Sequence, residues 1–425
     1  STLAKEDVLL YAFMKAKNPG IAALAEDILI AKLSDFSQLE TFIEETKPDF
    51  AVIGPENPLA AGIVDFLKTN GIPSIGPTKN AAKIESSKSF TRELMKKYDI
   101  PGLPEFKIYE RISDEEDFRE YVQSLGKVAV KRDGLAGGKG VKLMGEHLKT
   151  IDEVFDYCDE VFQLGEAVVI EELLEGEEFS LQCFVSDEKL IPMPIVQDHK
   201  RAYEDDEGPN TGGMGSYSDA THLLPFIPEE IVDEALAIMQ QTVTALKKET
   251  NIEYCGILYG GFILTSKGLK LLEFNARFGD PEAMNVLPIL ETSLVEIFQA
   301  MLEKRLGEIS ATFKEQATVC KYLVPKGYPV SPEGNKPVEI DRQGIENSDV
   351  KLFFSSVKEN KSGEIITTTS RAIALVGIED DLSTAEKKAE FATQFVKGTL
   401  FHRKDIGTST LIQQRIEHLK ELGVL

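Results

Sequence analysis

The sequence has few cysteines and no long apolar run. The four cysteines, Cys158, Cys183, Cys255 and Cys320, form neither a CxxC pair nor a metal-site spacing with histidines. We therefore expect reduced, buried thiols, typical of a cytoplasmic protein, rather than disulfides or a zinc site. No apolar stretch reaches the length of about 18 residues that indicates a membrane span. Residues 1–8 lack the pattern of a signal peptide.

A strong acidic excess limits the partners that we expect. The chain of 425 residues has 47 Lys and Arg against 71 Asp and Glu, which gives a formal net charge of −24. A polyanion such as DNA would be repelled by most of this surface, so general nucleic-acid binding is not expected. A small phosphate ligand remains compatible with the sequence, because a local cluster of Lys, Arg and backbone N–H groups is enough to bind it.

The length predicts about three modules, and the first of them reads as an α/β unit. In residues 1–80, short apolar runs alternate with amphipathic segments, which is typical of a doubly wound parallel sheet. The runs are Val8–Met14, Asp27–Ala31, Phe50–Gly54 and Ile72–Gly76. Such a sheet normally opens with a strand and a glycine-rich turn. Neither is found here, so we expect that the first strand is missing from this sequence.

Helical patterns dominate the connections in the remainder of the chain. A Lys-rich helix is expected at 81–100, before Pro101. A capping box formed by Ser113 and Glu116 predicts the start of another. Two long amphipathic helices are expected at about 228–249 and 282–304.

The first candidate site is the glycine-rich segment Lys131–Gly140, which lies between the predicted strands Val128–Lys131 and Val141–Met144. Small residues let a backbone fold tightly over phosphates, and the lysines add positive charge. The segment is not a Walker P-loop, because Gly140 rather than Ser or Thr follows Lys139 and no helix follows directly. Taken alone, the pattern fits a flexible hairpin turn equally well.

The second candidate is a set of three polar residues on one predicted strand. Glu273, Asn275 and Arg277 are two residues apart, so their side chains point to the same face. Carboxylate and amide oxygens are ligands that Mg²⁺ accepts together with phosphates, and Arg277 could grip an anionic substrate through two hydrogen bonds. A solvated strand face with a salt bridge explains the same pattern if the strand is considered alone.

Two further segments complete the candidates. Val169–Glu178 is a strand that ends in an acidic linker, which can offer backbone groups to an adenine edge and a carboxylate to ribose. Gln197–Arg201 and Gly208–Gly215 combine charges with glycines whose N–H groups can converge on a phosphate, and Asp198 could hold an ammonium group. An acidic loop and a long surface loop are the simpler explanations. We interpret His199 as a local hydrogen-bonding residue rather than a general base.

In this order, the motifs resemble the phosphoribosylamine–glycine ligase family of the ATP-grasp superfamily. The resemblance covers nearly the whole chain and is carried by Gly54–Leu59, Ser87–Thr91, Lys131–Gly140, Gln197–Gly215, Glu273–Glu282 and Phe401–Gly407. The pairing of Asn210–Gly215 with Glu273–Glu282 is its most specific part. The family's N-terminal glycine-rich loop is not found in this sequence.

The resemblance implies an α/β and α+β multidomain fold with three parts. The boundaries expected are 1–88 for an N-terminal Rossmann-like domain, 89–312 for an ATP-grasp domain with a mobile lid at about 103–175, and 313–425 for a small α+β C-terminal domain.

Residue roles follow from the same resemblance. ATP is expected to contact Lys88, Lys131, Gly137, Gly138, Lys139, Gly140, Glu171, Leu173 and Glu178. Mg²⁺ or Mn²⁺ is expected to bind Glu273 and Asn275. The glycine and phosphoribosylamine side is expected to include Asp198, Asn210, Thr211, Gly212, Gly213, Arg277 and Asp280, with Arg277 and Lys139 as catalytic residues.

The implied reaction joins glycine to 5-phosphoribosylamine through glycyl phosphate, with ATP converted to ADP and phosphate, in purine biosynthesis. A carboxylate is already ionised at about pH 7 and needs no general base to attack a phosphate, which agrees with the lack of a His, Ser or Cys nucleophile cluster. We expect a cytoplasmic monomer or weak homo-oligomer. The alternatives are another ATP-grasp carboxylate–amine ligase and an inactive ATP-binding relative.

Overall fold

The N-terminal segment contains two separate pairs of parallel strands. The structure is a computed structural model and describes residues 2–3, 6–135 and 140–425. β1 (Tyr11–Met14) pairs with β2 (Asp27–Ile30), and β3 (Ala51–Val52) pairs with β4 (Ser74–Ile75). The parallel pairing confirms the α/β pattern, although these strands do not join into one sheet within the described residues. The helices of this segment are α1 (Pro19–Ala22), α2 (Phe36–Thr46), α3 (Glu56–Ala61) and α4 (Ile63–Thr69).

The helix expected at 81–100 is interrupted. The structure has α5 (Lys83–Ser86) and α6 (Lys88–Lys97), separated by Ser87 in an extended conformation. The Ser87 side chain accepts a hydrogen bond from the Phe90 N–H, which makes it the N-cap of α6. This interruption places Lys88 at the start of a helix.

Residues 103–175 contain a four-stranded antiparallel sheet in the order β5-β8-β6-β7, which we call the lid sheet. Its strands are β5 (Phe106–Tyr109), β6 (Val128–Arg132), β7 (Val141–Leu143) and β8 (Val168–Glu172). α7 (Glu115–Leu125) and α8 (Ile151–Gln163) pack their apolar residues on it around Phe118 and Val154. The cap of α7 is Asp114 rather than the expected Ser113, because the Asp114 carboxylate accepts from the Glu116 and Asp117 N–H groups.

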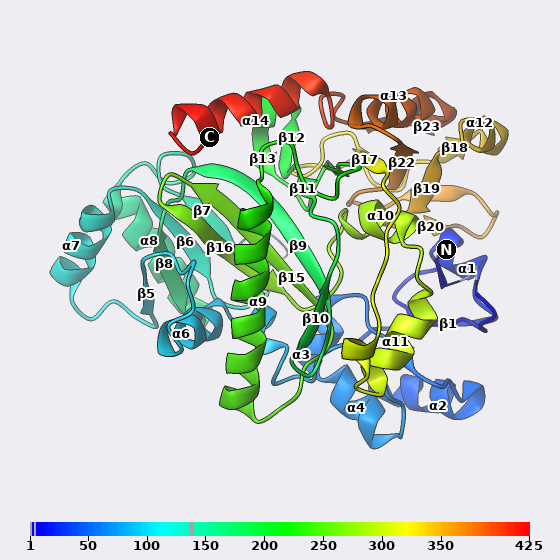
Figure 1. Cartoon of the computed structure of the whole chain (residues 1–425), viewed down its shortest axis with the longest axis horizontal. Helices are drawn as coiled ribbons and strands as arrows, with labels where there is room; N and C mark the ends of the chain where they lie inside the picture. The colour runs from blue at the N-terminus through cyan, green and yellow to red at the C-terminus, as the bar shows by residue number, and fades with distance from the viewer. Residues whose placement is uncertain (1, 4–5, 136–139) are drawn as a thin grey trace.

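A second four-stranded antiparallel sheet, the central sheet, has the order β10-β9-β15-β16. Its strands are β9 (Gly176–Ser186), β10 (Lys189–Pro192), β15 (Cys255–Thr265) and β16 (Gly268–Asn275). The expected helix at 228–249 is confirmed as α9 (Glu229–Thr250), which packs on this sheet (Figure 1). The continuous helix expected at 282–304 is wrong. The segment divides into α10 (Ala283–Val286), a 3₁₀ turn containing Pro288, and α11 (Leu294–Leu302), because proline cannot continue a helix hydrogen-bond ladder.

The third sheet combines strands from the middle and the end of the chain. β11 (Gln197–Asp198) and β14 (Gly215–Ser218) join the C-terminal strands in the order β11-β14-β17-β22-β19, and β24 also pairs with β17. The C-terminal members are β17 (Ala317–Pro325), β19 (Lys351–Phe354), β22 (Ile373–Glu379) and β24 (Leu400–Phe401). Since one sheet takes strands from both sides of residue 312, the expected domain boundaries remain predictions.

Small elements and three C-terminal helices complete the fold. They are the hairpin β12 (Arg201–Tyr203) and β13 (Glu207–Asn210), the pairs β18 (Val338–Ile340) with β23 (Val396–Gly398) and β20 (Val357–Glu359) with β21 (Ile365–Thr367), and the helices α12 (Arg342–Asn347), α13 (Leu382–Ala392) and α14 (Ser409–Glu421). α14 lies beside the β12–β13 hairpin (Figure 1). In the described part of the chain, no helix combines the length and apolar character needed to cross a membrane.

Candidate functional site

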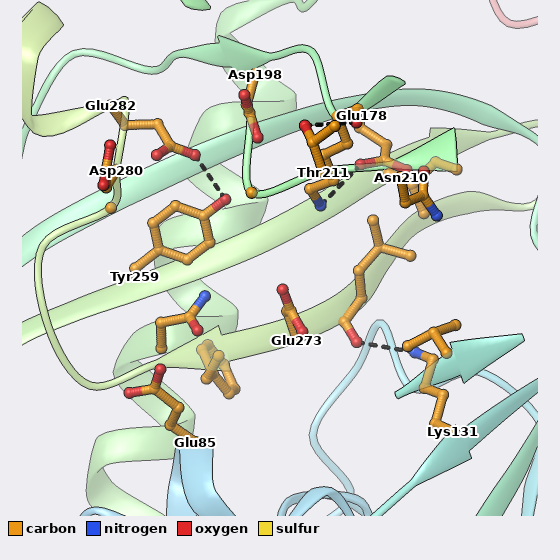
Figure 2. Close-up of a pocket in the computed structure, with 18 of the residues that line it drawn as sticks. Glu85, Lys131, Glu178, Asp198, Asn210, Thr211, Tyr259, Glu273, Asp280 and Glu282 are labelled. Carbon is orange, nitrogen blue, oxygen red and sulfur yellow. Dashed lines mark hydrogen bonds and ion pairs between the residues drawn. The ribbon is translucent and has the colours of Figure 1, made fainter. Parts of the chain in front are cut away.

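One cavity of about 980 Å³ draws its lining from all three sheets and from the N-terminal segment. Figure 2 shows Glu273 in the middle of this cavity, with Tyr259, Asp198 and Glu282 to one side and Lys131 to the other. Long-range pairing of short segments therefore brings together side chains that are scattered along the sequence.

A buried ion triad lies between the lid sheet and the central sheet. Glu171 in β8 is 1% exposed and accepts hydrogen bonds from Arg92 Nε at 2.6 Å and Arg92 Nη2 at 3.1 Å. Lys131 Nζ in β6 lies 2.7 Å from Glu171 Oε2, the oxygen that also accepts from Arg92 Nη2. Burial alone would raise the pKa of Glu171, but Arg92 and Lys131 outweigh it and lower this pKa to about 2. Burial lowers the pKa of Lys131, and the ionised Glu171 opposes that effect.

A β-bulge in the central sheet connects this triad to the candidate metal ligands. The register between β15 and β16 shifts at this point, so Leu272 is not paired with any residue of β15. Its carbonyl oxygen accepts from Lys131 Nζ at 3.1 Å and Arg92 Nη2 at 2.8 Å. The next residue, Glu273, lines the cavity together with Asn275.

The Glu273 carboxylate is held in its ionised form by nearby lysines. Burial would raise its pKa, but Lys200, Lys88 and Lys131, with Arg277, lower it overall. Among the described side chains, no group of three or more His, Cys, Asp or Glu is arranged to hold a metal ion. A carboxylate next to an amide suits a hard cation such as Mg²⁺, which takes few protein ligands and completes its shell with water and phosphate oxygens. The donor set therefore fits a metal bound jointly with a nucleotide.

Arg277 lies between two carboxylates from the N-terminal part of the chain. Its Nε is 3.5 Å from Glu56 and its Nη2 is 3.5 Å from Glu85. Glu85 also accepts from the Ala276 N–H at 2.7 Å. Burial raises the pKa of Glu85 to about 7, although Arg277 opposes this change. The arrangement leaves the Arg277 guanidinium on the cavity surface, where an anion can reach it.

On the opposite side, two carboxylates form an acidic corner. Asp198 and Glu282 both line the cavity, and Tyr259 donates its hydroxyl to Glu282 Oε1 at 2.9 Å. Asp198 Oδ1 is buried and has no hydrogen-bond partner among the described residues. Burial and the neighbouring Glu282 raise the pKa of Asp198, and burial raises the pKa of Glu282. A cation such as a substrate ammonium group would stabilise both carboxylates.

Arg371 holds the loop Asn210–Gly213 through hydrogen bonds to its carbonyl oxygens. Arg371 Nη1 donates to the carbonyl oxygens of Gly212 at 2.6 Å and Gly213 at 3.2 Å, and Nη2 contacts Asp280 Oδ2 at 2.8 Å. The Thr211 N–H donates to Lys200 O and the Gly213 N–H to Thr211 Oγ1. These two N–H groups are thus engaged within the protein, rather than converging on a ligand.

Most of the expected site residues line the cavity. They are Lys88, Lys131, Glu171, Leu173, Glu178, Asp198, Asn210, Thr211, Gly212, Glu273, Asn275, Arg277 and Asp280. Gly213 is buried next to Asp198. Gly140 is buried in the turn before β7, where its carbonyl accepts from the Arg132 N–H. The Leu173 N–H, which an adenine edge would need, donates to Lys127 O at 2.9 Å. Gly137, Gly138 and Lys139 lie outside the described residues.

The site residues that were not predicted from the sequence include Arg92, Arg371, Glu85 and Glu282. Arg92 and Arg371 had no local signal, since the hydrogen-bond partners of each side chain lie at least 79 residues away. Glu85 directly precedes the Ser87–Thr91 motif, and Glu282 closes the Glu273–Glu282 motif. Glu85 and Glu282 could have been predicted, because both are acidic residues beside or within these motifs.

Comparison with known proteins first defines the class. Three family models match in succession: the N domain of phosphoribosylglycinamide synthetase at 2–85, its ATP-grasp (A) domain at 86–283 and its C domain at 318–409. The biotin carboxylase domain of 2-oxoglutarate carboxylase from Hydrogenobacter thermophilus has the same fold, with a TM-score of 0.71 over 99% of this chain and 93% of that chain at 13% identity. This is an ATP-grasp protein with three domains.

Closer relatives then identify the family. A phosphoribosylamine–glycine ligase from Methanosarcina barkeri is 50% identical over 99% of this chain and 95% of the relative. The crystal structure of phosphoribosylamine–glycine ligase from Thermotoga maritima has a TM-score of 0.79 and 26% identity, and the match covers 95% of each chain. The chain belongs to the phosphoribosylamine–glycine ligase family, which confirms the resemblance inferred from the motifs.

Proposed function

We propose that this protein ligates glycine to 5-phosphoribosylamine, giving glycinamide ribonucleotide, ADP and phosphate, as a step of purine biosynthesis. The observation that carries the proposal is the cavity around Glu273. There a carboxylate kept ionised by three lysines adjoins an anion-binding arginine and a separate acidic corner. The site thus offers places for a polyphosphate, a metal ion, a carboxylate and an ammonium group, and the 50% identical relative named for this ligation supports the assignment.

ATP is assigned to the side of the cavity that adjoins the lid sheet. Lys88 and Lys131 would neutralise its phosphates, and the glycine-rich segment ending at Gly140 would cover them. The adenine and ribose are assigned to the linker between β8 and β9, with Glu178 as the ribose ligand. Glu273 and Asn275 would hold Mg²⁺ or Mn²⁺, which supplies charge neutralisation for the reacting phosphates.

Glycine is assigned to the space between Arg277 and the acidic corner. Its ammonium group would lie against Asp198 and Glu282, and its carboxylate would point towards Arg277 and the γ-phosphate. One carboxylate oxygen attacks the γ-phosphorus and ADP leaves, which gives glycyl phosphate. The amine of phosphoribosylamine then attacks the carbonyl carbon, phosphate leaves with that oxygen, and a proton is released. Catalysis of this kind rests on positioning and charge neutralisation.

Phosphoribosylamine is assigned to the side formed by Asn210–Gly212, where Arg371 holds the loop and Asp280. We further propose that the protein works in the cytoplasm, in keeping with its four free cysteines. A monomer or weak homo-oligomer remains our expectation.

The proposed function is tested by measuring ADP release with MgATP and glycine, with and without phosphoribosylamine formed in the assay from ammonia and ribose 5-phosphate. We expect release that needs both co-substrates, with glycinamide ribonucleotide detected by mass spectrometry. ADP release that needs glycine and a different amine would indicate another carboxylate–amine ligase. MgATP binding without any ligation would indicate an inactive relative.

A further inference from the structure

The C-terminal motif Phe401–Gly407 is not explained by the proposed chemistry, yet its charged residues Arg403 and Asp405 are held by several hydrogen bonds. Arg403 is 1% exposed. Its Nε donates to Asp405 Oδ1 at 2.9 Å, and its Nη1 donates to Asp206 Oδ1 at 2.7 Å and to Arg201 O at 3.2 Å. Asp405 in turn accepts from the Asp205 N–H at 3.1 Å. The motif therefore fixes the turn between β12 and β13, which lies about 200 residues earlier in the chain.

Asp206 is the centre of this arrangement. It sits in a left-handed conformation with φ of 53° and accepts a hydrogen bond from Arg415 in α14 in addition to Arg403. His199 Nδ1 lies 3.5 Å from the same carboxylate. Although burial opposes ionisation, His199, Arg415 and Arg403 together hold the pKa of Asp206 far below its usual range. A single carboxylate thus connects the C-terminal motif, the last helix and the strand segment that contains His199.

α14 makes a second contact through Glu177 at the start of β9. Arg415 Nε lies 3.4 Å from Glu177 Oε2, and His418 Nδ1 lies 2.6 Å from Glu177 Oε1. Gln197 Nε2 contacts the same carboxylate at 3.5 Å and donates to Glu178 O at 3.0 Å. α14 therefore reaches Gln197 through Glu177.

Both sets of contacts reach the residues next to Asp198 in the sequence, Gln197 and His199. Gln197 also accepts from the Tyr217 hydroxyl, and the His199 ring stacks on Tyr217 with ring centres 5.7 Å apart. Asp198 itself has an oxygen without a hydrogen-bond partner in the described structure. The backbone of Asp198 is paired with Ser216 in β14, and the side chains of the residues on either side of it are held by the C-terminal part of the chain.

We propose that Arg403 and Arg415 act through Asp206 as positioning residues, which hold Asp198 where it binds the ammonium group of glycine. The inference rests on the proposed function, because it takes glycine as the ligand of Asp198. It assigns a role to the Phe401–Gly407 motif and to α14, whose Arg415 lines the same cavity. Loss of Arg415 would leave Asp206 and Glu177 without a shared partner and weaken the side-chain support of His199 and Gln197, while the backbone pairing of β11 with β14 remains.

The test compares Arg415→Ala and Asp206→Asn with Lys420→Ala, which removes a positive charge from the exposed side of the same helix. KM for glycine, KM for ATP and kcat are measured with the full chain. We expect the first two variants to raise the glycine KM by about ten- to a hundredfold, the scale produced by misplacing a binding group, with the ATP KM within about twofold of the wild type. Arg415→Lys, which retains the charge, should give an intermediate glycine KM, and Lys420→Ala should match the wild type.

Three results would overturn the inference. The first is an unchanged glycine KM in both Arg415→Ala and Asp206→Asn. The second is an equal rise of the glycine and ATP KM values, since general damage to the fold explains that result. The third is a wild-type enzyme whose ADP release does not depend on glycine, which would refute the proposed function as well and so is distinguishable from the other two.

Discussion

Replacement of Glu171 by Gln tests the buried triad that links the lid sheet to the central sheet. The substitution keeps the size of the side chain but leaves the guanidinium of Arg92 and the ammonium group of Lys131 buried without a counter-charge. The pKa of Glu171 falls from its ordinary value of 4.5 to about 2. At about 1.4 kcal/mol per pH unit, this depression corresponds to about 3 kcal/mol of stability at neutral pH. Removing one partner of a buried ion pair typically costs about 3–5 kcal/mol, in agreement with that value.

The sign of the pH dependence follows from the lowered pKa. A depressed acid pKa stabilises the folded protein fully above the unfolded value of 4.5, and this contribution is lost as the pH falls towards about 2. The wild type should therefore be more stable than Glu171→Gln by a constant amount between about pH 6 and 8, and the difference should shrink in acid. The ATP KM should also rise, because Lys131 loses the carboxylate that favours its charged form.

The assay is equilibrium urea unfolding followed by circular dichroism at several pH values. Glu172→Gln is the matched control, since Glu172 is the next residue of β8 and its partner Lys267 is 75% exposed. Because the Lys267 side chain is largely in solvent, this pair should contribute about 0–1 kcal/mol. A loss of less than about 1 kcal/mol in Glu171→Gln at neutral pH, or a difference that grows in acid, would refute the reasoning.

Three further predictions concern the cavity. Glu273→Ala should lower metal-dependent ADP formation by at least about a hundredfold while circular dichroism shows an intact fold, and turnover at the wild-type rate would exclude Glu273 as a metal ligand. Gly213→Ala should lower the melting temperature and raise the glycine KM. Gly213 has a φ of 113°, and the added Cβ would lie 2.6 Å from Asp198 Oδ1 and 2.7 Å from Pro281 Cδ. A variant with unchanged glycine KM and melting temperature would contradict that account. Because burial raises the pKa of Glu85 to about 7, the wild type loses stability as the pH rises from 4.5 through 7, so Glu85→Gln should be the more stable protein above pH 7 and equal to it below pH 4.5. Unfolding curves at pH 4.5 and 8 check the sign, and a variant that is less stable at pH 8 would show it to be wrong.

Local patterns in the sequence were sufficient for part of the fold. α9 has a regular apolar face over 22 residues, and the predicted helix at 228–249 matches it closely. The Lys131–Gly140 segment lies between two antiparallel strands, as expected. The continuous helix predicted across Pro288 does not form. The apolar spacing on both sides of Pro288 favours a helix, but the proline interrupts it. The predicted N-cap of α7 is wrong by one residue, because Ser113 and Asp114 are both good capping residues and only the backbone geometry distinguishes them.

The candidate site could be predicted only where chemistry and spacing were local. Glu273 and Asn275 lie two residues apart in β16, so their common approach to the cavity could be inferred from their spacing. The prediction that Arg277 shares this strand is wrong, because β16 ends at Asn275, although Arg277 still lines the cavity. The contacts of Arg92 with Glu171 and of Arg403 with Asp206 could not be predicted, because the two residues of each pair are 79 and 197 residues apart. The sheet that unites β11 and β14 with the C-terminal strands is equally non-local. Such contacts depend on the tertiary fold rather than on any neighbouring motif.

The most direct test of the proposed function follows oxygen atoms through the reaction. Glycine labelled with ¹⁸O in both carboxylate oxygens is incubated with MgATP, phosphoribosylamine and the enzyme, and the released phosphate is analysed by mass spectrometry. Attack of the glycine carboxylate on the γ-phosphate, followed by attack of the amine on glycyl phosphate, predicts one ¹⁸O atom in each phosphate. Phosphate that contains no ¹⁸O, released while glycinamide ribonucleotide is formed, would contradict the glycyl phosphate route and the assignment of the cavity that rests on it.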